Sequence, residues 1–233
     1  MLIIAAPAII TSFTNQGDAI RYQLVIFDMD GTLTVDALDY ETLRSELGVA
    51  VRHPVLEWIA ALPEREQTRA WAVLHQHEAQ AAEKSTLRQD AHLALDALRK
   101  RGIKIALLSR NSRKSVETIL QRHALSFDDV ISRDEPPVKP HPDSIRGIAR
   151  RLNISLDRTL MAGDYVFDIE VAEAAQVASV LLTSPEKPRP PFAQRATYVI
   201  SSLLELDRLV EEPDSFRALL SAKQVNGECI NGK

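Results

Sequence analysis

The sequence predicts an α/β protein: a Rossmann-like parallel sheet with helices on both faces, plus a small all-helical cap inserted after the first strand. Two observations lead to this prediction. From Ile103 onward, short apolar runs alternate with segments of helical periodicity, as is typical of a parallel sheet. After the first apolar run, Leu24–Phe27, about 50 residues show helical patterns only, too many for an ordinary crossover connection.

The chain of 233 residues is long enough for one large domain or for a core with a modest insertion. The change from strand-rich to helix-only patterns sets the expected boundaries. We predict a discontinuous core of residues 20–35 and 87–212, a helical cap of residues 36–86, an N-terminal extension of residues 1–19, and a C-terminal helix and tail of residues 213–233.

Composition narrows the class of protein. The net charge of −4 gives no indication of a nucleic-acid surface. The single cysteine, Cys229, excludes an internal disulfide framework and is compatible with a reducing compartment, so we expect a cytoplasmic protein. The apolar stretch Leu2–Ile10 is too short to cross a bilayer and lacks a basic leader region. It is interpreted as an extra strand or a loose extension rather than a signal peptide, and no membrane partner is expected.

Three helices are expected within the insert. Leu38–Leu47 has helical spacing and stops at Gly48, a residue that commonly ends helices. Pro54–Leu62 and Pro63–Lys84 each open on a proline, which suits a first helical turn. Trp58 and Trp71 are expected to form part of the insert's own core.

Beyond the insert, a helix over Asp90–Arg101 is expected to bury Leu93, Leu95 and Leu98, and its basic C-terminal residues favour the helix macrodipole. The remaining elements alternate. We expect strands at Ile103–Leu108, Asp129–Ser132, Thr159–Ala162, Ser179–Thr183 and Tyr198–Ile200, and helices near Ser112–His123, Asp143–Leu152 and Phe167–Gln176.

Two aspartates follow the first strand directly. The run Leu24–Phe27 leads into Asp28-Met29-Asp30-Gly31-Thr32, so both carboxylates stand at the C-terminal tip of a buried strand. In open α/β sheets ligands bind at that edge. Because two such carboxylates repel each other unless a cation or a shared proton compensates them, the pair indicates a functional site.

Other polar residues stand at further strand ends or in adjoining loops. Ser109 follows the strand that ends at Leu108, and Lys139 lies in a proline-rich loop before a helix. Asp164 ends another strand, and Asp168 follows four residues later, near the first turn of a helix that can bring it to the same site. Each residue alone has an ordinary structural explanation, but their joint occurrence indicates one site.

Together these residues predict a phosphoryl-transfer centre. Asp28 and Asp164 supply the hard oxygen ligands that Mg²⁺ prefers. Asp28 would also attack phosphorus, and Asp30 would protonate the leaving alcohol and later accept a proton from water. Ser109 and Lys139 would hold the phosphoryl oxygens.

The same residues resemble the four motifs of the haloacid dehalogenase-like superfamily of phosphotransferases. The segment from Asp28 to Thr32 matches the first motif, DxDGT; Ser109 matches the second; Lys139 matches the third; and Gly163-Asp164 with Asp168 matches the fourth. The resemblance covers about residues 23–210. It implies hydrolysis of phosphate esters with Mg²⁺, with the backbone carbonyl of Asp30 also reaching the metal. Asp168 would support the metal through water or pair with the lysine.

The position of the insert resembles the subfamily with a small helical cap, and the architecture is similar to that of the phosphoglycolate-type phosphatases, which are well-known relatives. A cap of this size suits a small phosphorylated metabolite. The residues from Thr34 to Leu38, however, depart from the Asp-Ser often seen in those relatives, which leaves the substrate open. Arg52 and His53 could grip an anionic group of the substrate or form a solvated loop. His75 and His77 lie two apart on a helix and make a poor metal pair.

Two alternatives to a phosphatase remain open. One is a sugar-phosphate mutase of the same fold, in which an aspartyl phosphate survives exposure to water. The other is a non-catalytic phosphate-binding regulatory protein. A dehalogenase is disfavoured because that chemistry requires neither Asp30 nor Mg²⁺. The oligomeric state is not indicated by the sequence.

Overall fold

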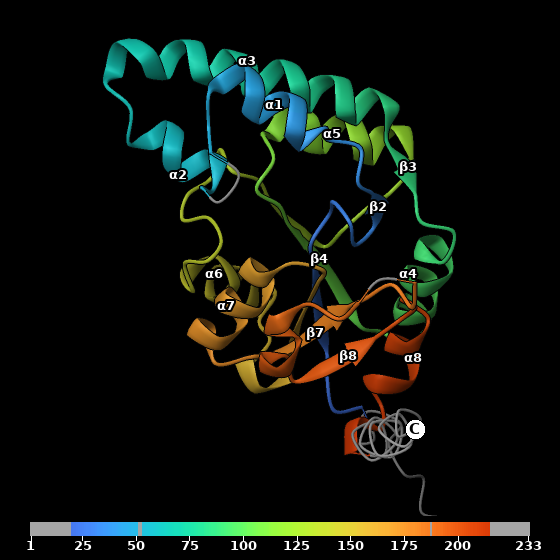
Figure 1. The fold of residues 1–233 in the computed structure, drawn as a ribbon. Coiled ribbons are helices and arrows are strands. Elements are labelled where there is room, and N and C mark those ends of the chain that lie inside the picture. The colour runs from blue at the N-terminus through green and yellow to red at the C-terminus, as the bar shows by residue number, and fades with distance from the viewer. Residues whose placement is uncertain (1–19, 51–52, 187, 215–233) are drawn as a thin grey trace, which may run out of the picture.

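The computed structural model describes residues 20–50, 53–186 and 188–214. Its main sheet has six strands, and in Figure 1 this sheet lies below the helices of the insert. All neighbouring strands in this sheet run parallel. Their spatial order is β5 (Asp129–Ile131), β4 (Lys104–Leu108), β1 (Leu24–Phe27), β6 (Thr159–Gly163), β7 (Ala178–Leu182) and β8 (Tyr198–Ile200). The predicted α/β class is confirmed. The strand order changes direction at β1, so the carboxyl end of β1 is where a ligand crevice is expected.

Strand β1 is buried on both sides, and its residues alternate between two apolar clusters. Leu24 and Ile26 pack in one cluster, while Val25 and Phe27 pack in the other. This alternation follows from the two-residue period of a strand. A strand covered on both faces cannot have a polar side, which explains the continuous apolar run in the sequence.

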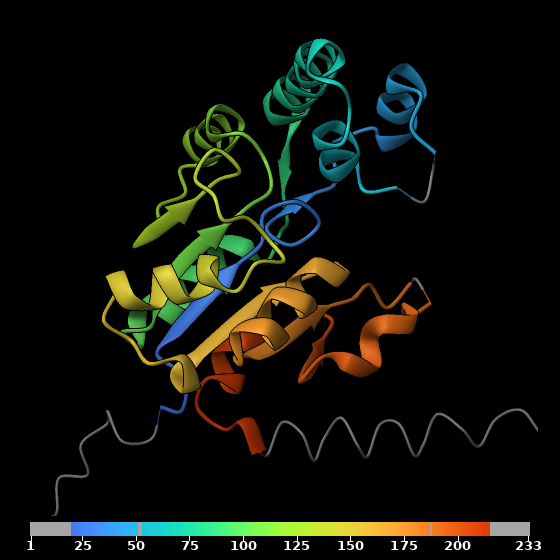
Figure 2. The ribbon, with the colours of Figure 1, turned by 90° about the vertical axis from the view of Figure 1, so that its left-hand side faces the viewer.

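Helices cover both faces of the sheet. On one face lie α6 (Asp143–Arg151) and α7 (Val166–Ala175), and on the other lie α4 (Ala91–Lys100) and α8 (Glu205–Leu209) (Figures 1 and 2). α5 (Arg113–Arg122) buries Val116 and Ile119 against the second cluster. Two short 3₁₀ helices span Leu156–Arg158 and Pro191–Arg195.

The prediction that Leu93 of α4 is buried is wrong. Leu93 is 64% exposed, whereas Leu95 and Leu98 are buried as expected. The buried face of the helix also contains Ala91 and Ala94, so it follows the spacing of three and four residues that one helical face requires. Leu93 lies outside that stripe, and the small alanines let α4 lie close to the sheet.

The insert consists of α1 (Tyr40–Leu47), α2 (Val55–Ala60) and α3 (Glu64–Lys84). It is joined to the core through a short antiparallel pair that the sequence did not indicate, β2 (Thr34–Val35) and β3 (Thr86–Leu87). The insert has an apolar cluster of its own, and Trp58 and Trp71 pack against it as expected. α3 also lies along α5 of the core (Figure 1). The domain boundaries given above stay a prediction.

Several sequence expectations lie outside the described residues. They concern the N-terminal extension, Arg52, Cys229 and the tail from residue 215 onward. Within the described ranges, no helix is both long and apolar enough to cross a membrane.

Candidate active site

The turn after β1 presents Asp28 and Asp30 on either side of a buried anchor. The side chain of Met29, between them, is fully buried in the apolar core. Its carbonyl oxygen accepts hydrogen bonds from the backbone N–H groups of Leu33 (2.8 Å) and Thr34 (3.0 Å). The tight turn is therefore fixed by backbone bonds and by one core side chain, and the two aspartates extend from it.

Lys139 joins two of the predicted site residues. Its Nζ donates to Asp28 and, across 2.8 Å, to Oδ1 of Asp168. The side chains of Lys139 and Asp168 are only 2% exposed. Burial alone would lower the pKa of Lys139, but the carboxylates of Asp168 and Asp28 hold that pKa above its ordinary value. Lys139 is thus a fixed positive charge beside Asp28.

Asp28 and Asp164 form the acidic side of the site. Burial, followed by the charges of Asp168 and Asp164, raises the pKa of Asp28 well above its ordinary value, and Lys139 acts in the opposite direction. Burial, Asp168 and Asp36 raise the pKa of Asp164 to about 7. Oxygen atoms of Asp28, Asp164 and Asp168 lie within 4.8 Å of one another. This crowding of buried carboxylates fits a divalent cation, which would offset their repulsion.

Two glycines make the close approach of these carboxylates possible. Gly31 has a φ of +75°, and a Cβ built there would lie 2.2 Å from Oδ2 of Asp164. A Cβ on Gly163 would lie 2.1 Å from Cγ of Asp168. Neither position can accept a side chain without displacing an acidic group of the site, so both glycines are part of the site's geometry.

Asp168 has both carboxylate oxygens engaged. Oδ1 accepts from Lys139, and Oδ2 accepts a hydrogen bond from the backbone N–H of Tyr165 across 3.0 Å. The second bond fixes Asp168 at the start of α7, where a carboxylate also stabilises the helix terminus. Of the two roles that the family resemblance implies for Asp168, pairing with the lysine is the one seen in this structure.

Asp30 is held by a residue that the sequence reasoning missed. The Nδ2 of Asn111 donates to Oδ2 of Asp30 across 2.6 Å, and the hydroxyl of Thr34 lies 3.5 Å from Oδ1. Burial raises the pKa of Asp30 to about 6, even though the hydrogen bond from Asn111 works against the rise. A carboxyl group with a pKa near neutrality is suited to both donating and accepting a proton.

Ser109 lies at the same edge of the sheet as Asp28, because β4 and β1 are paired neighbours. Its side chain is buried, and its Oγ accepts a hydrogen bond from the backbone N–H of Asn111 across 3.1 Å. The position of Asn111, two residues beyond Ser109 at the same strand end, was the one signal in the sequence that could have identified it.

The insert also contributes groups near the site. Asp30, Asn111 and Glu78 of α3 line one small cavity. Leu38, two residues before α1, lines the same cavity. The segment before α1 and the middle of α3 therefore lie beside the acid-base carboxylate.

The histidines of the insert lie in different surroundings. His77 pairs with Glu46 at 2.9 Å, whereas His75 stacks on Trp71, so the two histidines do not share a ligand. His53 is exposed, and Arg52 is not among the described residues.

The sequence model of the haloacid dehalogenase-like hydrolases matches residues 22–176, about two thirds of the chain, and spans all six predicted site residues. The chain belongs to the haloacid dehalogenase-like hydrolases. The resemblance drawn from the four motifs is thereby confirmed, and the enzyme is a hydrolase of a family with phosphatase members.

Two relatives of this haloacid dehalogenase-like hydrolase illustrate the range of similarity. A haloacid dehalogenase-like hydrolase domain-containing protein of Arabidopsis thaliana is 27% identical over 163 residues, which are 64% of this chain and 65% of the relative. The chain thus spans slightly less than two thirds of that relative's length. The phosphoglycolate phosphatase of Escherichia coli is 28% identical over 203 residues, covering 68% of this chain and 80% of the relative.

Solved structures show the same fold. A hydrolase from Pseudomonas syringae superposes with a TM-score of 0.70, covering 82% of this chain and 98% of that chain, at 18% sequence identity. At this level of identity the likeness concerns the fold alone.

Proposed function

We propose that this hydrolase is an Mg²⁺-dependent phosphatase that hydrolyses a small phosphomonoester through an aspartyl-phosphate intermediate on Asp28. The observation that carries the proposal is the placement of Asp28. It contacts the buried cation Lys139, and its carboxylate oxygen lies within 4.8 Å of an oxygen of Asp164. A nucleophilic carboxylate between a fixed cation and a second carboxylate is arranged to accept a phosphoryl group together with a metal ion.

Each residue has a separate task in the proposed reaction. An oxygen of Asp28 attacks phosphorus while the bond from phosphorus to the ester oxygen breaks, and Asp30 gives its proton to the departing oxygen. A water molecule then attacks the phosphorus of the aspartyl phosphate, Asp30 takes the proton of that water, and the bond to Asp28 breaks. Inorganic phosphate is released, and both aspartates return to their starting states.

Ser109 and Lys139 are proposed to hold the phosphoryl oxygens. Both are buried and stand at the edge of the sheet beside Asp28, so they would meet developing charge without rearrangement. Asp28, Asp164 and the backbone carbonyl of Asp30 are the proposed ligands of Mg²⁺, with Asp168 as support. When bound, the ion neutralises the carboxylates and the phosphoryl oxygens around it.

The substrate is proposed to be a small phosphorylated metabolite that the helical insert, acting as a cap, encloses. Support comes from the position of the insert, whose residues Leu38 and Glu78 line one cavity with Asp30. The similarity to the Escherichia coli phosphoglycolate phosphatase makes phosphoglycolate the first compound to test. The mutase and the non-catalytic regulator remain the alternatives, and a cytoplasmic location remains a prediction.

One experiment separates these functions. Purified protein with Mg²⁺ is assayed for release of inorganic phosphate from phosphoglycolate, sugar phosphates and p-nitrophenyl phosphate, beside Asp28→Asn. We expect turnover that Asp28→Asn and chelators abolish. Isomerisation of a sugar phosphate without phosphate release would indicate the mutase, and phosphate binding without turnover of any compound would indicate the regulator.

A further inference from the structure

The loop after Ser109 is held in place by an ion pair between the insert and the core. Glu78 lies on α3 of the insert, and Arg133 lies in the loop that follows β5. Both terminal nitrogens of the guanidinium donate to Glu78: Nη1 to Oε1, and Nη2 to Oε2 across 2.9 Å. The exposed fractions of the two side chains are 9% for Arg133 and 3% for Glu78, so the pair is buried.

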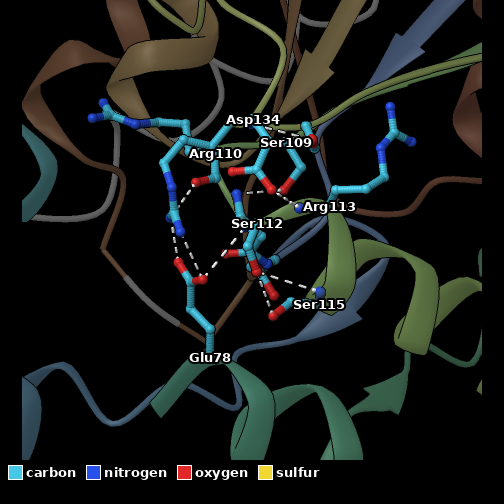
Figure 3. A network of polar contacts seen from close by, with 11 residues as sticks. Glu78, Ser109, Arg110, Ser112, Arg113, Ser115 and Asp134 are labelled. Atoms are coloured by element: carbon cyan, nitrogen blue, oxygen red, sulfur yellow. Dashed lines mark hydrogen bonds and ion pairs between the residues drawn. The ribbon is translucent and has the colours of Figure 1, made fainter. Parts of the chain in front are cut away.

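This Glu78–Arg133 pair also binds the backbone of the loop. Nη1 of Arg133 donates to the carbonyl oxygen of Arg110 across 2.9 Å, and Oε2 of Glu78 lies 3.4 Å from the backbone N–H of Ser112. The backbone N–H of Arg133 donates to the carbonyl oxygen of Asn111 across 2.9 Å. Figure 3 shows Glu78 reaching from α3 toward the loop of Arg110 and Ser112. The backbone on both sides of Asn111 is therefore bonded to the pair.

Asn111 is fixed from the active-site side as well. Its backbone N–H donates to Oγ of Ser109, and its side chain donates to Oδ2 of Asp30 across 2.6 Å. With its N–H, its carbonyl and its side chain all engaged, Asn111 can point its amide in one direction only. That direction is toward the carboxylate proposed to move the proton.

Trp71 holds the guanidinium from another side. The Cζ of Arg133 lies 5.2 Å from the centre of the Trp71 ring, and Trp71 belongs to the same helix, α3, as Glu78. The orientation of Arg133 therefore depends on two side chains of the insert, spaced seven residues apart on one face of α3.

We propose that Asn111 is a positioning residue for Asp30 and that Glu78 and Arg133 fix its orientation, so that proton transfer by Asp30 requires the insert to be seated on the core. The proposal rests on the proposed function, since it takes Asp30 as the group that protonates the leaving oxygen. It adds that α3 of the insert acts on this step through Arg133 and Asn111, in addition to enclosing the substrate.

The test uses the dependence of the rate on the leaving group. A p-nitrophenolate leaves as a stable anion and needs little proton donation, whereas the alkoxide of an alkyl phosphate needs a full proton. A misplaced Asp30 therefore slows alkyl phosphates more than aryl phosphates. The value of kcat/KM reports the steps up to the transfer of phosphoryl to Asp28, in which Asp30 is the donor.

We expect Asn111→Ala to lower kcat/KM for an alkyl phosphate by about 10²-fold and for p-nitrophenyl phosphate by less than about tenfold, given what a general acid typically contributes. Glu78→Gln and Arg133→Gln should shift the ratio of the two rates in the same direction, and the double variant should be no worse than the more affected single one. If Asn111→Ala does not fold, Asn111→Ser is used instead.

The matched control is Glu135→Gln. Glu135 lies in the same loop as Arg133 and pairs with Arg113, the first residue of α5, but this pair is at the surface, with Glu135 44% exposed. Its loss should leave the ratio unchanged. Equal losses for both substrates in Asn111→Ala, or unchanged ratios in Glu78→Gln and Arg133→Gln, would overturn the proposal. The Asp30→Asn variant distinguishes a failure of this proposal from a failure of the proposed function. If Asp30→Asn slows the alkyl and the aryl phosphate equally, the proposed role of Asp30 as proton donor is wrong as well.

Discussion

The ammonium group of Lys139 lies 2.8 Å from the carboxylate of Asp168, and both side chains are removed from solvent almost completely. The same ammonium group contacts Asp28. One buried cation thus compensates the buried carboxylate of Asp168 and the partly exposed carboxylate of Asp28, and its removal affects folding as well as chemistry.

Lys139→Met should therefore lower both stability and activity. Asp28 and the buried Asp168 lose their partner, and breaking a buried ion pair typically costs about 3–5 kcal/mol in the free energy of unfolding. Loss of one phosphoryl-oxygen donor should lower kcat by about 10²–10³-fold. Urea unfolding and steady-state kinetics measure the two effects. The double variant Lys139→Met/Asp168→Asn should regain part of the stability without regaining activity; recovery of activity would show that Lys139 acts only through Asp168.

Gly31→Ala and Gly48→Ala form a matched pair of substitutions. Both glycines have a left-handed backbone, with φ of +75° and +73°, but only at Gly31 would a Cβ meet a neighbour, the carboxylate of Asp164. Gly48→Ala should cost about 1 kcal/mol of stability from backbone strain and leave kcat unchanged. Gly31→Ala should cost more and reduce turnover, because Asp164 must move. Equal activity in the two variants would mean that the close approach of Asp164 is not required.

Mg²⁺ should stabilise the protein in a pH-dependent manner. Binding to the folded state alone, at a concentration 100 times Kd, adds about 2.7 kcal/mol to the free energy of unfolding. Carboxylates must be ionised to bind the metal, and the pKa of Asp164 is raised to about 7, so the affinity should fall as the pH decreases below 7. Thermal unfolding with and without Mg²⁺ at pH 8 and pH 5.5 measures this. Asp164→Asn should remove the Mg²⁺ effect at both pH values, and Ser109→Ala should retain it.

The hydrogen bonds of Asp90 predict that the protein loses stability in acid, independently of the active site. Its Oδ2 accepts hydrogen bonds from the hydroxyl of Ser202 (2.8 Å) and the backbone N–H of Leu203 (2.9 Å), joining the start of α4 to the segment before α8. Burial alone would raise the pKa of Asp90, but these bonds and Arg88 hold that pKa below its ordinary value of 3.8. The unfolded chain therefore binds this proton more readily.

The stabilisation from Asp90 is thus fully present above the unfolded pKa and is lost as the pH falls from about 4 through the lower folded pKa. Asp90→Asn should lower stability at neutral pH by about 1–3 kcal/mol, and its stability should depend less on pH below 4 than that of the unmodified protein. Asp96→Asn, a change at an exposed position of the same helix, serves as the control. If the Asp90→Asn variant and the unmodified protein lost stability in parallel below pH 4, this account would be contradicted.

Much of the fold and of the site could be predicted from the sequence because the signals are local. A continuous apolar run such as Leu24–Phe27 requires burial on both sides, and polar groups placed directly after it have to gather at one edge of a parallel sheet. The strand-end position of Asn111 is a local signal of this kind, but the contacts that Asn111 and Glu78 make could not be predicted in this way. Their roles depend on contacts between distant segments, 81 residues apart for Asn111 and Asp30 and 55 for Arg133 and Glu78. The exposure of Leu93 has a different cause: residues two apart on a helix, such as Leu93 and Leu95, point to opposite sides and cannot both be buried on one narrow face.

The separate apolar cluster of the insert has a consequence for how this enzyme can diverge. Its members, among them Leu43, Ile59 and Leu74, do not belong to either cluster of the sheet. Residues of α1 and α2 can therefore be exchanged during evolution with little effect on the strands that carry the aspartates. The two partners of Arg133 on α3, Glu78 and Trp71, do not share this freedom. Lineages that acquire new substrates are expected to vary α1 and α2 while retaining Glu78 and Trp71.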